Sequence, residues 1–349
     1  MNIKLTDRQQ RIIALIASQK QLSISQIKEQ LGEDISQITL NRDLAKLVKH
    51  NFLDKTGKAR AITYAVSDFY NLFADIDIEA YFQKDPDQRD ASQHFNYDLL
   101  DVLGNAEIFS KKEKDLLESI KQEYLENIKS ISPTLYKKEM ERLTIELSWK
   151  SAQIEGNTYS LLETEKLFLE RESAKNKTKE ETIMLLNHKD ALHYLLKHKD
   201  LAKELNLKVI EEVHSLLIKD LGVGKNIRKR GVGITGTAYK PLDNEFQIKE
   251  FLIKMCDVIN AKENGFEKAL LAIVLISYIQ PFEDGNKRTG RMIGNALLIN
   301  NEACPLSYRS VDSVDYKKAI LLFYEQNNLS EFKQLFIEQN EFGVKNYFR

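Results

Sequence analysis

The sequence predicts a mainly α-helical protein with a small N-terminal domain that contains both helices and strands. Only five prolines and fourteen glycines interrupt its 349 residues, and the chain is rich in the helix formers Leu, Lys and Glu. A chain of this length can form two or three domains with separate cores. Its composition also changes along the sequence. Residues 1–60 carry eleven Lys/Arg against six Asp/Glu, although the net charge of the whole chain is −1.

Residues 1–66 predict a winged helix-turn-helix domain. Thr6 and Ser23 each start a capping box that is completed by a glutamine three residues later, and Ser36 is placed to cap a third helix. Alternating apolar residues on either side of the turn at 55–60 then indicate two strands. Three short helices followed by a hairpin rich in basic residues are typical of this fold.

The third predicted helix has the features of a DNA-reading helix. Its segment Ile38-Thr-Leu-Asn-Arg-Asp-Leu44 resembles the recognition helix of DeoR-like bacterial regulators, whose pattern is Ser-x-x-Thr-x-x-Arg-Asp-Leu. The basic charge of this domain fits contacts with DNA phosphates. The residues expected to contact DNA are Gln37, Thr39, Arg42 and Lys46. The alternative, a winged helix that mediates protein interaction or dimerisation, stays open.

The region that follows predicts a linker and then a second, larger domain. Residues 67–106 are acidic and aromatic-rich, which indicates a linker that packs on the second domain, and residues 107–349 are dominated by amphipathic helical patterns. The two cysteines, Cys256 and Cys304, lack metal-ligand spacing and suggest reduced core residues. With no signal-peptide pattern and no apolar run long enough to span a bilayer, we expect a cytoplasmic protein without membrane partners.

The most informative stretch begins where an apolar helix over 269–279 ends. It reads Gln280-Pro-Phe-Glu-Asp-Gly-Asn-Lys-Arg-Thr-Gly-Arg291. Proline disfavours helical geometry in the residue before it, and Gly285 can adopt a positive φ in a turn. A second helix is expected to start at Asn286 or Lys287, with its free N–H groups facing the loop. Those N–H groups predict an anion site.

Charged side chains reinforce this prediction. Lys287 lies on the first turn of the helix, and Arg288 and Arg291 are three residues apart, so both guanidinium groups project to one side and can bind neighbouring phosphates. Asp284, an isolated carboxylate beside them, suits a divalent metal that bridges phosphate oxygens.

This stretch resembles the signature of the Fic (Fido) family, His-Pro-Phe-x-Asp/Glu-Gly-Asn-Gly/Lys-Arg-x-x-Arg, at eight of its nine specified positions. The resemblance covers about residues 95–340. It implies a Fic/Fido helical core that binds ATP and Mg²⁺ and transfers AMP to a Ser, Thr or Tyr hydroxyl of a target protein. Asp284 would hold the metal. The residues implied in nucleotide binding are Gly285, Asn286, Lys287, Arg288 and Arg291, and those implied in catalysis are Asn286, Arg288 and the residue at position 280.

The one mismatch concerns that residue. The family has its catalytic His there, which accepts the proton of the target hydroxyl, and this chain has Gln280. Glutamine has no nitrogen that titrates near neutral pH, so it cannot accept that proton.

A second motif implies an inhibitory helix over about 147–157. Ser151 and Glu155 are four residues apart, on one face of a helix that Gly156-Asn157 should terminate. The spacing Ser-x-x-x-Glu-Gly resembles the Fic inhibitory motif, which here comprises Ser151, Glu155 and Gly156. The resemblance implies that Glu155 reaches Arg291 and competes with the γ-phosphate of ATP for the same guanidinium.

A third motif implies the Fic flap, which holds a target segment along its edge. Glycines and threonines interrupt the helical pattern, and the apolar pairs around them predict a short β-hairpin. The flap residues are Val232, Gly233, Ile234, Thr235, Gly236 and Thr237.

Together these motifs predict a Fic-type ATP-binding protein that is autoinhibited by Glu155, impaired in AMP transfer by Gln280, and joined to a DNA-binding domain. Three alternatives stay open. The chain could be an active adenylyltransferase that obtains its base elsewhere, or Gln280 could be a laboratory replacement of His. The third is a transcriptional regulator whose Fic part only senses nucleotide or dimerises. A homodimer is compatible with each of them.

Overall fold

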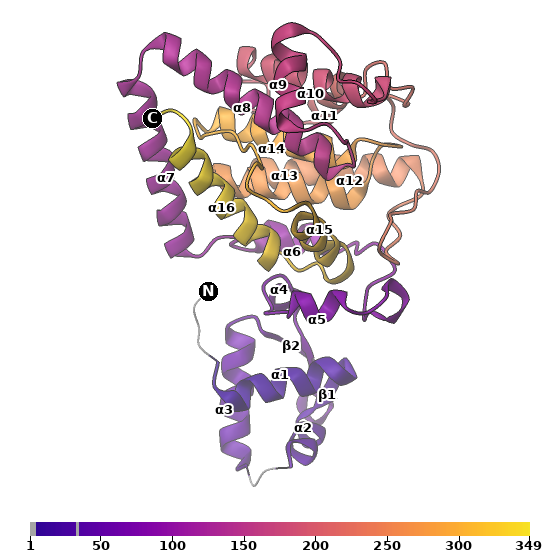
Figure 1. Ribbon diagram of the computed structural model, residues 1–349. Coiled ribbons are helices and arrows are strands. Elements are labelled where there is room, and N and C mark those ends of the chain that lie inside the picture. The colour runs from indigo at the N-terminus through magenta and orange to yellow at the C-terminus, as the bar shows by residue number, and fades with distance from the viewer. Residues whose placement is uncertain (1–4, 33–34) are drawn as a thin grey trace. The chain divides into compact units, whose positions relative to one another are not determined.

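The computed structural model describes residues 5–32 and 35–349, and they form two compact units (Figure 1). The first unit extends through Ile76 and also includes Gln326–Ser330, and the second consists of Asp77–Glu325 and Glu331–Arg349. The division at Ile76 lies inside the segment 67–106 that the composition marked as a linker. None of the described helices is long and apolar enough to cross a membrane.

The first unit has the three helices that its caps predict. Both capping boxes are present, and the Ser36 hydroxyl accepts a hydrogen bond from the backbone N–H of Thr39 at 3.2 Å. Ile12, Ile16 and Leu44 are fully buried in the core between the helices. The elements of this unit are α1 (Asp7–Gln19), β1 (Gln21–Ser23), α2 (Ile24–Leu31), α3 (Gln37–Lys49), β2 (Leu53–Thr56), η1 (Ala59–Ala61), β3 (Thr63–Val66) and α4 (Asp68–Asn71).

The two predicted strands are present, and a third strand joins them. β2 and β3 pair antiparallel with Leu53 opposite Val66, while β1 pairs with the other edge of β3, which places Leu22 opposite Tyr64. β1 was not predicted, because three residues are too short for an alternating pattern to be recognised. The sheet order β1-β3-β2 completes the winged helix-turn-helix.

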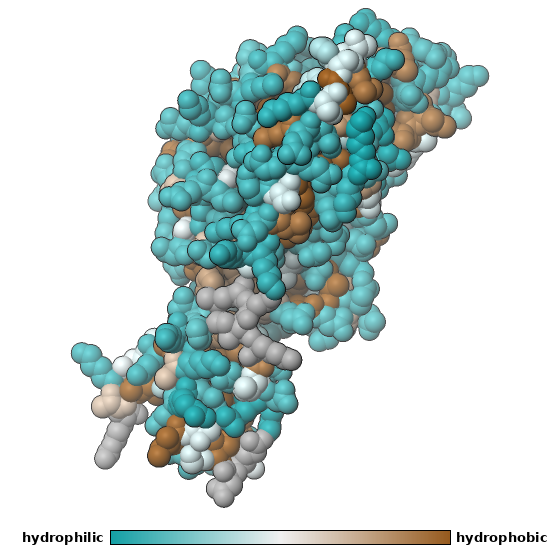
Figure 2. Space-filling model, turned by 90° about the vertical axis from the view of Figure 1, so that its left-hand side faces the viewer, coloured by the Kyte–Doolittle hydropathy of each residue, from teal (hydrophilic) through white to brown (hydrophobic). Residues whose placement is uncertain are grey.

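The second unit is almost entirely helical, as predicted. Its elements are α5 (Ile78–Phe82), η2 (Pro86–Gln88), α6 (Leu99–Asn105), α7 (Lys111–Ser130), α8 (Pro133–Ile154), α9 (Leu161–Glu170), α10 (Lys179–Lys197), α11 (Leu207–Leu217), α12 (Glu245–Ala261), α13 (Gly265–Ile279), α14 (Asn286–Asn300), α15 (Ser313–Gln326) and α16 (Ser330–Asn346). On the face shown in Figure 2, hydrophilic residues cover most of the surface, and hydrophobic residues reach it in small groups.

Helices α13 and α14 run side by side at the centre of this unit (Figure 1). Every residue of α13 from Ala269 to Ile279 is buried. A Cβ added at Gly294 of α14 would lie only 2.5 Å from Cγ1 of Ile273, so the glycine is what allows the two helices to approach closely. Helices α8, α10 and α11 contact α14, and α12 contacts α13. The loop 280–285 that joins this central pair is therefore held by a rigid core.

Candidate functional site

The loop between α13 and α14 is held in place by its own amide side chains. Gln280 is 9 % exposed and ends α13 with a left-handed backbone, φ 51°. Its Nε2 donates to the carbonyl oxygen of Ser277 at 2.6 Å, and its Oε1 accepts from Nδ2 of Asn286 at 2.9 Å. Asn286 also bonds both the N–H and the carbonyl of Phe282 at 2.8 Å. Both ends of the Gln280 amide therefore stabilise the loop.

The start of α14 has the features of an anion site. Gly285 precedes the helix with φ 81°, and no side chain caps the first N–H groups. A Cβ at Gly285 would lie 3.2 Å from Cγ2 of Ile218, so space as well as conformation favours glycine there. Nη1 of the buried Arg288 has no hydrogen-bond partner among the described residues. A buried guanidinium N–H without an acceptor is costly, and a phosphate oxygen would satisfy it.

The expectation that Asp284 is an isolated carboxylate is wrong. Its Oδ2 lies 2.7 Å from Nη2 of Arg288, and its Oδ1 accepts from the backbone N–H of Gly285 at 2.6 Å. The two charged residues are four apart across the turn that opens α14, which brings them into contact. No three His, Cys, Asp or Glu side chains in the described chain cluster as a metal site. Asp284 could thus supply one ligand to a Mg²⁺ ion whose other ligands came from phosphates and water.

Arg291 contacts the end of α8. Its Nη2 lies 2.9 Å from Oε1 of Glu155 and donates to the carbonyl oxygen of Ser151 at 3.0 Å, while its Nε donates to Oγ of Ser151 at 2.9 Å. Lys287 reaches the other carboxylate oxygen of Glu155, also at 2.9 Å. Burial alone would raise the pKa of Glu155, but Arg291 and Lys287 lower it to about 2.

The residues around Glu155 fix its position from both sides. On the α8 side, Ser151 Oγ lies 2.9 Å from Nε2 of His188, whose Nδ1 lies 2.7 Å from the carbonyl oxygen of Met184. These contacts place the ring proton on Nδ1, so Nε2 accepts from the Ser151 hydroxyl, which in turn accepts from Arg291. Burial lowers the pKa of His188 to about 3, so the ring is neutral at physiological pH.

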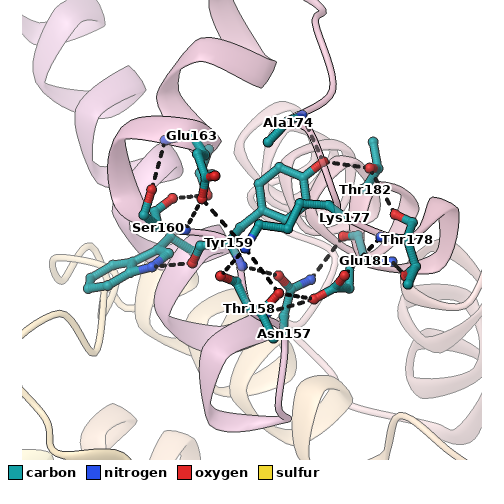
Figure 3. A network of polar contacts seen from close by, with 12 residues as sticks. Asn157, Thr158, Tyr159, Ser160, Glu163, Ala174, Lys177, Thr178, Glu181 and Thr182 are labelled. Carbon is teal, nitrogen blue, oxygen red and sulfur yellow. Dashed lines mark hydrogen bonds and ion pairs between the residues drawn. The ribbon is translucent and has the colours of Figure 1, made fainter.

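On the other side, the loop that follows Glu155 is tied to the start of α10 (Figure 3). Asn157 donates through Nδ2 to the carbonyl oxygen of Glu181 at 2.9 Å, and the N–H and hydroxyl of Thr158 donate to the Glu181 carboxylate at 2.8 and 2.6 Å. Lys177 adds a hydrogen bond from Nζ to the carbonyl oxygen of Thr158 at 2.6 Å. Glu155 thus lies in the chain between two anchored segments.

The predicted flap hairpin is absent: residues 231–240 contain a turn at Thr235-Gly236 but no strands. Two backbone groups of this segment are bonded to residues far away in the sequence. The N–H of Lys240 donates to the carbonyl oxygen of Gln93 at 3.1 Å, and the carbonyl oxygen of Gly236 accepts from Nη2 of Arg89 at 2.8 Å. The hairpin prediction failed because these partners are remote in sequence.

Two arginines that the sequence did not single out hold the flap. Arg228 is buried and donates to the carbonyl oxygen of Gln280 at 2.6 Å, to that of Arg230 at 2.7 Å, and to that of Leu242. It thereby ties both ends of the flap to the C-terminal end of α13, where a cation is favoured. Arg89 holds the tip, since its Nη1 lies 2.8 Å from the buried carboxylate of Glu325.

A cavity of about 460 Å³ brings most of these elements together. That volume is within the range of small-molecule sites. The residues that line it from the expected site are Glu155, Gly233, Ile234, Thr235, Gln280, Asp284, Gly285, Asn286 and Lys287. Helix α15 also lines the cavity, through four residues that no motif of the sequence pointed to: Lys317, Ile320, Leu321 and Tyr324. Arg288 and Arg291 are buried behind this lining, and Arg291 is only 1 % exposed.

In the first unit, the expected DNA-contacting residues lie on α3. Gln37, Arg42 and Lys46 are exposed, whereas Thr39 is half-buried and its hydroxyl shares a hydrogen bond with Ser36 Oγ at 2.9 Å. The opposite face of α3 contributes Leu40, Leu44 and Leu47 to the core. The helix therefore presents a polar and basic face to the outside.

Comparison with known families agrees with these two sites. The model of the Fic/DOC family matches residues 204–298, which include α11 to α13 and the loop 280–285, and that of the DeoR-like helix-turn-helix domain matches residues 8–63. The chain therefore contains a Fic domain and an N-terminal DeoR-like helix-turn-helix domain. Helix α8, which bears Glu155, lies outside the matched region of the Fic model.

Solved Fic structures share the fold of the second unit. Fic-1 (residues 134–508) from C. elegans is 22 % identical, covers 68 % of this chain and 72 % of its own, and superposes with a TM-score of 0.56. A Fic-domain-containing signaling protein from Bacteroides thetaiotaomicron is 18 % identical over 66 % of this chain and 94 % of its own, with a TM-score of 0.57. A Fic family protein from Desulfovibrio desulfuricans is 17 % identical over 68 % and 74 %, with a TM-score of 0.56.

Proposed function

We propose that this Fic-domain protein binds ATP with Mg²⁺ and is autoinhibited by Glu155. The observation that carries the proposal is the 2.9 Å ion pair between Glu155 and Arg291 beside a cavity lined by the signature loop. An ionised carboxylate held by both Arg291 and Lys287 competes with a phosphate for the same two cations. The bound nucleotide would then place its γ-phosphate away from Arg291, in a pose unsuited to transfer.

We further propose that AMP transfer to a protein Ser, Thr or Tyr hydroxyl is impaired. In that reaction the hydroxyl oxygen bonds to the α-phosphorus of ATP, pyrophosphate leaves, and the hydroxyl proton must pass to an acceptor. The amide of Gln280 cannot take it, because it has no basic lone pair and both its ends are hydrogen-bonded to Ser277 and Asn286. Bound Mg²⁺, held by Asp284 and phosphate oxygens, would neutralise charge on the nucleotide.

The direct test restores the missing proton acceptor. Transfer from α-labelled ATP is measured for the unaltered chain, Gln280→His, Glu155→Gly and the double variant, with the chain itself and a lysate as acceptors. General-base catalysis contributes typically 10²–10⁴-fold. We therefore expect the double variant to exceed Glu155→Gly by about a hundredfold or more. Adding Arg288→Ala as a control should remove this activity if it arises at the proposed site.

Two results would contradict the proposal. Strong transfer by the unaltered chain would favour the alternative of an active adenylyltransferase whose base lies elsewhere. A silent double variant that still binds ATP in calorimetry would favour a regulator in which the Fic domain only senses nucleotide. The DeoR-like domain supports DNA binding by such a regulator, with Gln37, Arg42 and Lys46 as contacts on α3.

A further inference from the structure

The exposed face of α3 contains an apolar residue among polar and basic ones. Ile38 is 81 % exposed, although the buried stripe of the same helix already contains Leu40, Leu44 and Leu47. A β-branched residue at an exposed helix position also lowers helix propensity slightly. Neither core packing nor local helix formation therefore accounts for isoleucine at this position.

Its place on the helix identifies the surface to which it belongs. Ile38, Arg42, Ala45 and Lys49 follow one another at intervals of four, three and four residues, which puts them on one stripe of α3. All four are exposed, and the stripe lies opposite the core. Ile38 is on the first turn of α3, and the N-terminal residues of a recognition helix are those that approach base edges in the major groove.

We propose that Ile38 reads the C5-methyl group of a thymine in the DNA site of this protein. In the major groove only the A·T pair presents a methyl group, and apolar side chains recognise it by contact. Arg42 and Lys49 on the same stripe would contact phosphates and hold the helix in register, so that the apolar end meets a base. The inference rests on the proposed DNA binding and adds a specific base contact to it.

The experiment removes the methyl from the DNA and the side chain from the protein in turn. Duplexes bound by the full-length chain are first selected from a random-sequence library at low salt. Each thymine of the selected duplex is then replaced by deoxyuridine, which keeps every hydrogen-bonding group and lacks only the methyl. Binding of each duplex is measured for the unaltered chain and for Ile38→Ala.

At one thymine of the selected duplex, deoxyuridine should weaken binding by the unaltered chain about fourfold, the value of one buried methyl group. Ile38→Ala should bind the two duplexes equally. Ile38→Val should retain part of the difference. Arg42→Ala should weaken binding to both duplexes and leave the ratio of the two affinities unchanged. Leu162→Ala, which truncates a 74 % exposed apolar residue in the other unit, should change neither affinity.

Three results would overturn the inference. One is the absence of any deoxyuridine effect with the unaltered chain. Another is an effect of unchanged size in Ile38→Ala, which would assign the methyl contact to a different residue. The third combines equal binding of the two duplexes by the unaltered chain with weaker binding of both by Ile38→Ala, which would assign Ile38 to protein association. If no duplex is selected at all, DNA binding itself fails, a result distinct from these three.

Discussion

Replacing Glu155 by glutamine should destabilise the second unit, and ATP binding should restore part of the lost stability. The carboxyl pKa of Glu155 falls from 4.5 to about 2. This difference corresponds to about 3 kcal/mol of net stabilisation of the ionised carboxyl, in which the attraction to Arg291 and Lys287 outweighs the cost of burial. Its side chain is only 15 % exposed, so solvent screening removes little of this energy. Glutamine has the same shape without the charge, so it can still accept a hydrogen bond from Arg291 but leaves that buried guanidinium without a carboxylate counter-charge.

The assay is thermal unfolding of the unaltered chain and Glu155→Gln, with and without ATP–Mg²⁺. Without nucleotide the variant should unfold at lower temperature. With nucleotide, the melting temperature of the variant should rise by more than that of the unaltered chain. The reason is that a phosphate can now occupy the position of the carboxylate, and ligand binding stabilises the folded state. Glu283→Gln is the control, since Glu283 lines the same cavity and forms no ion pair among the described residues. Equal melting without nucleotide, or equal gains with it, would refute this reasoning.

The pH dependence gives the same prediction a second check. A carboxyl whose pKa is lowered in the folded state stabilises it above the unfolded pKa of 4.5, and this contribution is lost as the pH falls through the folded value of about 2. The difference in unfolding free energy between the unaltered chain and Glu155→Gln should therefore be full at neutral pH and shrink between pH 4.5 and 2. A difference that did not change with pH would mean that the effect of the substitution does not come from the charge of Glu155.

Three further predictions concern other contacts. Arg288→Ala should weaken ATP binding about tenfold or more in calorimetry, because a phosphate loses a charge-assisted hydrogen bond; unchanged affinity would contradict the anion site. Arg42→Ala should weaken DNA binding and reduce the salt dependence by about one phosphate contact, measured by anisotropy at several salt concentrations, and an unchanged slope would exclude that contact. Arg89→Ala leaves the buried Glu325 carboxylate without its cation and should lower the unfolding free energy by about 3 kcal/mol and speed amide exchange over 231–240. Exchange as slow as in the unaltered chain would show that the flap does not depend on Arg89.

The signature loop could be predicted from the sequence because its determinants are local. Gly285 takes the positive φ that the turn requires, and the uncapped helix starts at Asn286. The end of α8 followed from Gly156 in the same way. The contact between Glu155 and Arg291 joins residues far apart in sequence, and only the family resemblance implied it. The four-residue spacing of Asp284 and Arg288 is a local signal for an ion pair. The prediction missed it because the carboxylate was assigned to a metal instead.

The flap shows where local reasoning ends. Glycines and threonines between apolar pairs indicate a hairpin only if the two arms bond each other. Here the carbonyl of Gly236 bonds Arg89, a residue 147 positions earlier in the chain, and the base of the flap bonds Arg228. Nothing in a run of sequence distinguishes an arginine that will satisfy buried carbonyls from one that will face water. Such partners become evident only when the fold brings them together.

The geometry at Gln280 separates nucleotide binding from transfer. A side chain that merely replaced a catalytic base would be expected to leave the loop less well held. The Gln280 amide instead uses both its ends, to Ser277 and to Asn286, and Asn286 in turn holds Phe282. The start of α14, where a phosphate would bind, therefore keeps its conformation although residue 280 cannot accept a proton. For this reason ATP binding should depend on Arg288 and Glu155 whether or not residue 280 is a base, and transfer should depend on all three.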